Sequence, residues 1–161
     1  MKKIFLLLSI SFLLSCSSND DNNSTNNPDN STNISEYVGK WKLTGKTNST
    51  GNNIAVSDCE DDYNWTQINS DGASIISKFN LYSSGGAYYC NANVKNYNCT
   101  RSNNILTFTN INSTGLVYEL KYEILSVNSL TLIIKNISSK TGDVVTPIPQ
   151  NQQISETFTK I

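Results

Sequence analysis

The chain has 161 residues, with 12 basic and 13 acidic side chains, no histidine and four cysteines. This length fits a single domain. The absence of histidine excludes a Ser-His-Asp triad, a Cys-His pair and every histidine metal ligand. The formal charge of −1 argues against nucleic acid as a partner, because phosphate binding needs clustered lysine and arginine.

The first residues have the pattern of a secretory signal. Lys2 and Lys3 give a positive start, and an apolar stretch that is too short to span a bilayer follows. The stretch ends in Ser15-Cys16, which resembles the bacterial lipobox, whose cysteine is lipidated and becomes the mature N-terminus. We therefore predict a signal peptide at residues 1–15 and a lipid anchor, of the palmitate type, on Cys16.

The segment after Cys16 is dominated by asparagine, serine, threonine and aspartate, and Ile34 is its one apolar side chain. Such a composition cannot bury enough surface to offset the entropy of ordering, so we predict a disordered tether over residues 16–35. Residues 17–21 resemble the short acidic export signal of Bacteroidota surface lipoproteins. The resemblance implies the bacterial outer membrane, with the cell surface favoured over the periplasmic side.

From Val38 onward the apolar residues recur with a period of two, as in half-buried strands. Runs of β-branched and aromatic residues lie at 39–44, 63–68, 74–82, 87–91, 94–100, 105–109, 116–124, 130–135 and 154–161. Turn-forming residues separate the runs, and residues 140–153, with two prolines, predict a loop over the surface or the barrel mouth. We predict an all-β fold over residues 36–161, an antiparallel meander of about eight strands that forms a barrel or a half-closed sandwich.

A family resemblance begins at Gly39-Lys40-Trp41, which is similar to the Gly-x-Trp motif of lipocalins. The order of later features resembles the lipocalin-like domains of Bacteroidota lipoproteins: Cys59, Asp71-Gly72, Cys90, Asn104-Ile105-Leu106-Thr107, Leu130-Thr131-Leu132 and the closing residues 157–161. Residues 96–99 depart from the aromatic strand that the family tends to show. The resemblance implies that Trp41 closes the narrow end of the barrel and that Lys160 stacks on its ring.

Cys59, Cys90 and Cys99 lie outside the cytosol in this interpretation, so disulfides are permitted and one thiol is left over. The family resemblance implies the pair Cys59–Cys90. The alternative is Cys90–Cys99, which a hairpin turn near Val94 would bring face to face. A catalytic thiol at Cys99 has no histidine to activate it.

Four acidic residues surround Cys59: Asp58, Glu60, Asp61 and Asp62. Carboxylates suit Ca²⁺, but this spacing matches no calcium loop, so we expect a solvated loop, no metal site and no cofactor. Glu119 and Glu123 share a strand face about 13 Å apart, which is too far for a retaining glycosidase. Lys121 between them favours an outer face of ion pairs.

Aromatic residues gather in the first half of the domain: Tyr63, Trp65, Tyr82, Tyr88, Tyr89 and Tyr97. Aromatics with polar tips bind sugars, phenolic compounds or protein surfaces, and they also pack as cross-strand pairs, which we favour here.

These observations predict a monomeric, non-enzymatic, membrane-anchored lipoprotein that holds a small apolar or amphipathic ligand in a lipocalin-like barrel. The alternative is a cell-envelope interaction or adhesion module, which binds protein or polysaccharide through its outer aromatic face and loops. An empty interior volume favours the first function, and a packed interior with an exposed aromatic patch favours the second.

Overall fold

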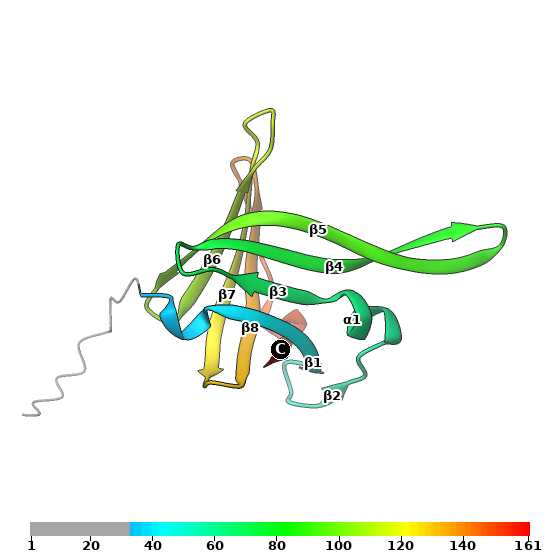
Figure 1. Cartoon of the computed structure of the whole chain (residues 1–161), viewed down its shortest axis with the longest axis horizontal. Coiled ribbons are helices and arrows are strands. Elements are labelled where there is room, and N and C mark those ends of the chain that lie inside the picture. Colours follow the sequence, from blue (N-terminus) through cyan, green and yellow to red (C-terminus); the bar gives the residue numbers. More distant parts are fainter. Residues whose placement is uncertain (1–32) are drawn as a thin grey trace, which may run out of the picture.

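Alternating side chains along the strands build a closed antiparallel β-barrel (Figure 1). The computed structural model of the protein describes residues 33–161. The strands follow the order β10-β1-β3-β4-β5-β6-β7-β8, and β10 also pairs with β8, which closes the barrel. Strands β2 and β9 add to β1 and β8 outside this ring. The predicted all-β fold is therefore confirmed, as a barrel and not as a sandwich.

The strands have the following bounds: β1 Gly39–Thr47, β2 Asn53–Ile54, β3 Trp65–Ile68, β4 Ala73–Ser84, β5 Ala87–Ser102, β6 Ile105–Ile111, β7 Val117–Val127, β8 Thr131–Thr141, β9 Val144–Pro147 and β10 Ser155–Lys160. The described residues also include the α-helix α1 (Asp58–Tyr63) and the 3-10 helices η1 (Ser35–Tyr37) and η2 (Gln150–Gln152). Every strand pairing is antiparallel, and side chains alternate between the inner and outer faces of each strand except at the register shifts in the pairings of β1 with β10 and of β7 with β8.

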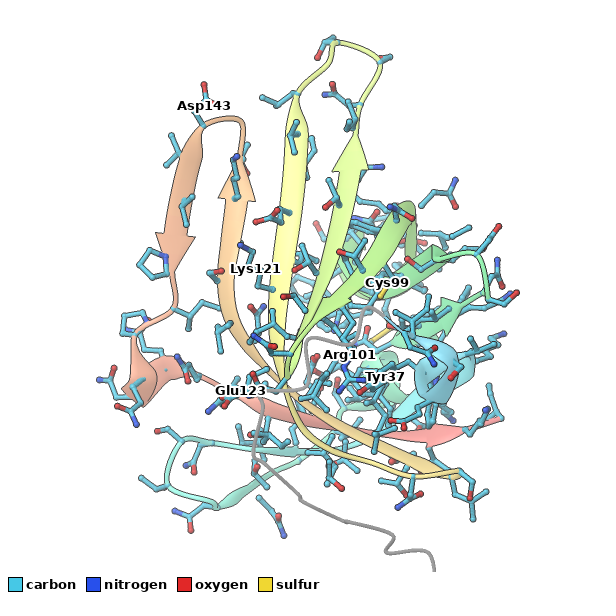
Figure 2. The ribbon with its side chains drawn as sticks, turned by 90° about the vertical axis from the view of Figure 1, so that its left-hand side faces the viewer. Tyr37, Cys99, Arg101, Lys121, Glu123 and Asp143 are labelled. Atoms are coloured by element: carbon cyan, nitrogen blue, oxygen red, sulfur yellow. A yellow bond between two sulfur atoms is a disulfide. The ribbon has the colours of Figure 1, made fainter. Side chains whose placement is uncertain are left out.

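One end of the barrel is closed by aromatic side chains. Trp41 is fully buried, and its indole Nε1–H donates to the carbonyl oxygen of Tyr37 at 2.7 Å. The Nζ of Lys160 lies 5.2 Å from the centroid of the Trp41 ring, as the lipocalin resemblance implies. Arg101 stacks in the same way on Tyr37 of η1, with its guanidinium carbon 5.6 Å from the ring centroid (Figure 2).

The core fills the barrel from this closed end. It contains Tyr37, Trp41, Leu43, Ile68, Ile76, Cys99, Leu106, Phe108, Tyr122, Leu132, Ile134 and Phe158. Ile34 packs against the same cluster and η1 begins at Ser35, so the last residues of the predicted tether belong to the folded domain.

Two local predictions differ from the structure. The runs at 87–91 and 94–100 form one strand, β5, because β4 pairs with it without a register shift and no turn interrupts it. The predicted loop at 140–153 contains β9 and η2, although its middle does lie beside the barrel mouth.

A disulfide joins Cys59 of α1 to Cys90 of β5, with the two Cα atoms 5.8 Å apart. The alternative pair Cys90–Cys99 is wrong, because nine residues of one extended strand separate these cysteines by about 30 Å. Cys99 is a buried, free thiol, and burial raises its pKa to about 12. It therefore stays protonated at neutral pH and belongs to the core.

Replacing Gly39 by alanine is expected to destabilise the closed end. The backbone of Gly39 has a φ of +143°, which L residues rarely adopt, and a Cβ atom there would also displace Cε of the flexible Lys160 side chain. We expect the free energy of unfolding to fall by about 1–3 kcal/mol in urea titrations. Gly51→Ala is the matched control, since its φ is +84° but no atom lies near the added Cβ. An equal loss in both variants would contradict a special requirement for glycine at the closed end.

Candidate functional site

The end of the barrel opposite Trp41 opens into a cavity of about 390 Å³ that is partly open to solvent. Its wall contains apolar, charged and amide side chains: Lys46, Glu60, Lys78, Leu120, Tyr122, Asn136, Ile148, Gln152, Ile154 and Glu156. Phe158 lies beneath the cavity in the core, and the centroid of its ring is 6.0 Å from the Nζ of Lys78. The interior is thus packed at one end and hollow at the other.

Five barrel strands and two short helices place these side chains. The strands β1, β4, β7, β8 and β10 supply the inner wall, while α1 and the segment around η2 form the rim. The helix α1 begins with a capping box, in which Ser57 Oγ accepts from the Glu60 backbone N–H and the Glu60 carboxylate accepts from the Ser57 N–H. This cap fixes Glu60 at the rim.

Two ion pairs lie in the wall. Lys46 Nζ donates to both carboxylate oxygens of Glu60, at 2.6 and 2.7 Å, and Lys78 Nζ donates to Glu156 at 2.9 Å. Glu156 is also the cross-strand partner of Lys46, so the four charges form one group. Burial alone raises the pKa of Glu60, but hydrogen bonds from Lys46 and Ser57 outweigh it and hold the pKa below its usual value.

Two uncharged polar side chains lie deeper in the wall. Asn136 Oδ1 is buried and has no hydrogen-bond partner, which is rare for a buried polar atom. Burial, together with the negative charge of Glu156, raises the pKa of Tyr122, so its hydroxyl remains protonated. The Asn136 oxygen is covered, so the polar groups that the wall presents beside its apolar side chains include the neutral hydroxyl of Tyr122 and the exposed amide of Gln152.

The acidic cluster around Cys59 forms a helix rather than a loop, but Asp58, Asp61 and Asp62 are exposed to solvent as expected. Besides Glu60, Asp61 pairs with Lys42 of β1 at 3.0 Å. Within residues 33–161, no group of three acidic, cysteine or histidine side chains is placed to hold a metal ion. The sequence carried a signal for this helix in Ser57-x-x-Glu60, the spacing of a capping box.

The carboxylates of β7 form the outer ion pairs that their alternation predicts. Glu119 lies 3.3 Å from Lys121 Nζ, and Glu123 lies 2.6 Å from Lys135 Nζ of β8. Glu123 and Lys121 are seen on the outside of the sheet in Figure 2.

The aromatic residues do not form one cluster. Tyr97 lies edge-on to Phe108 beside the core, and Trp65 carries Lys40 Nζ 4.4 Å above its ring. Tyr82, Tyr88 and Tyr89 are exposed on the hairpin of β4 and β5. The interpretation as cross-strand packing therefore holds only in part.

The predicted signal peptide, Cys16 and all but the end of the tether lie outside the described residues. No helix within the described range is long and apolar enough to cross a membrane. Comparison of the chain with family models, curated proteins and solved structures finds no match. The candidate site therefore rests on the geometry of this barrel alone.

The pair Lys46–Glu60 predicts a pH-dependent stability. Because the pKa of Glu60 is lowered by folding, its contribution is present above the unfolded value near 4.5 and is lost as the pH falls through the folded value. Glu60→Gln is expected to lower the free energy of unfolding by about 1–3 kcal/mol at pH 7, and by less toward pH 3. Urea titrations across this range measure the difference.

Asp62→Asn is the matched control, because it removes the same charge from an exposed position of the same helix. We expect it to have little effect at any pH. A loss for Glu60→Gln that does not change with pH would contradict the assignment to the Glu60 carboxylate.

Proposed function

We propose that the protein binds a small amphipathic ligand in the cavity at the open end of the barrel. The observation that carries this proposal is the partly enclosed volume of about 390 Å³, which falls within the range of small-molecule sites. It lies next to a fully packed core, so the wall is held in place before a ligand arrives.

The wall chemistry supports an amphipathic ligand. Leu120, Ile148 and Ile154 offer apolar contact, whereas the exposed side-chain amide of Gln152 offers hydrogen bonds to a hydroxyl or N–H group of the ligand. The two glutamates of the wall are each held by a lysine. A general base needs a carboxylate that is free to take a proton, so the arrangement favours binding over catalysis.

Filling the cavity is expected to weaken the binding of an amphipathic probe. Ile154→Trp adds a bulky ring to a side chain that is 39 % exposed at the cavity entrance, where it can be accepted without repacking the core. The probe is cis-parinaric acid, titrated by fluorescence. We expect saturable one-to-one binding by the wild type and about a tenfold weaker affinity in the variant, equal to about 1.4 kcal/mol.

Leu130→Trp is the matched control, because Leu130 is 65 % exposed and its carbonyl accepts from the Lys160 N–H at the closed end. It should bind the probe as the wild type does. Absence of saturable binding in the wild type, or equal loss in both variants, would overturn the cavity as the site.

We also propose that Cys16 carries a lipid that anchors the protein to the bacterial outer membrane, with the cell surface favoured. The support is the sequence alone: a positive start, a short apolar stretch, and a cysteine directly after Ser15. A single acyl chain binds membranes reversibly, so a stable anchor of this kind carries more than one chain.

Metabolic labelling with an alkyne analogue of palmitate tests the anchor. The wild type is expected to be labelled and to partition with membranes, and Cys16→Ser to lose both properties. Cys99→Ala is the control, since it removes the free cysteine of the described residues and should keep the label. An unlabelled wild type contradicts the lipid anchor.

A further inference from the structure

Strands β4 and β5 continue far beyond the barrel as a two-stranded projection (Figure 1). The neighbouring strand β3 pairs with β4 no further than Ser77, and β6 pairs with β5 only from Asn98 onward. We call residues 79–92 the arm. Within it, each strand has only the other as its sheet partner.

The two faces of the arm have different surroundings. Lys78 points into the cavity, and the register of β4 with β5 has no shift, so the same face continues outward through Asn80 and Tyr82. Their cross-strand partners are Asn91 and Tyr89. We call these four residues the inner face of the arm.

The outer face of the arm is tied to α1. Cys90 lies on this face and is bonded to Cys59 of α1. At the base of the arm, the buried Asn64 accepts the Phe79 backbone N–H through Oδ1 at 2.7 Å. The disulfide and this hydrogen bond therefore restrain the arm relative to α1, so its inner face is ordered before a ligand binds.

The inner face combines stacked rings with unused amides. Tyr82 and Tyr89 stack with their ring centroids 5.5 Å apart, and they are 45 % and 48 % exposed. The side-chain amides of Asn80 and Asn91 are exposed and have no hydrogen-bond partner in the described part of the chain. Amides both donate and accept hydrogen bonds, and tyrosine rings offer apolar contact with a polar tip.

The charge and size of this face exclude most partners. Residues 79–94 contain no charged side chain, so neither a polyanion nor a charged peptide finds a counter-charge. The face has no aliphatic side chain to hold a lipid tail. Its four Cα atoms span only about 7 Å along the strands and about 5 Å across them, so the face is far smaller than the roughly 800 Å² per partner of a stable protein interface.

We propose that the inner face of the arm binds a short stretch of an uncharged, linear oligosaccharide. The C–H faces of sugar rings pack on Tyr82 and Tyr89, and the sugar hydroxyls exchange hydrogen bonds with Asn80 and Asn91. This is a second site, and it does not depend on a ligand in the cavity.

Calorimetric titration of the full-length protein with maltohexaose, cellohexaose, xylohexaose and mannohexaose tests the proposal. We expect at least one of them to bind, and Tyr82→Ala and Tyr89→Ala each to weaken it about fivefold or more. Tyr88→Ala is the matched control, because Tyr88 is 76 % exposed but lies on the outer face, and it should change the affinity less than about twofold. Thermal melting checks that each variant is folded.

Several outcomes overturn the proposal: binding of none of the four sugars, an equal loss in Tyr88→Ala, or equal affinity for an anionic polygalacturonate hexamer. Capture of a protein through the arm without sugar binding also overturns it. The cavity variant Ile154→Trp should keep its sugar affinity, and Tyr82→Ala should keep its parinaric acid affinity. A loss of sugar binding in Ile154→Trp places the sugar in the cavity and refutes the arm site.

Discussion

The barrel depends on the last strand, β10, which pairs with β1 along one edge and with β8 along the other. Without it, the sheet would have two open edges and no enclosed interior. Along this strand, alternate residues face inward, and they pass from Glu156 in the cavity wall to Phe158 in the core and Lys160 on the Trp41 ring. The six residues of β10 thus contribute to the cavity, to the packed core and to the closed end of the barrel.

The short helix α1 connects the two candidate binding surfaces. A helix of six residues is not stable alone, and the capping box, the disulfide and the ion pairs with β1 hold this one. Two neighbouring residues of this helix make different contacts: Cys59 is bonded to Cys90 of the arm, and Glu60 forms part of the cavity wall. Movement of the helix would therefore disturb the arm and the mouth together.

The sequence predicted what local periodicity and the lipocalin resemblance encode: the all-β class, most strands, the place of Trp41 and Lys160, and the disulfide. It did not predict that β5 is continuous, because the three polar residues among 93–96 look like a turn, although β4 pairs with all four residues of this stretch. The residues of the cavity wall could not be predicted, since the wall joins side chains as distant in the chain as Lys46 and Glu156. Only closure of the sheet brings these together, and no short motif records that.

The difference between the two barrel ends follows from the cost of burying charge. At the closed end, Lys160 keeps its charge at the rim and covers an aromatic ring, so large apolar side chains fill the space behind it. At the mouth, Lys46 and Lys78 project inward, and each needs a carboxylate partner and contact with water. Apolar packing cannot extend through such a group of ion pairs, so the cavity lies where they begin. The arm, which carries no charge, has no such constraint and leaves its rings open to solvent.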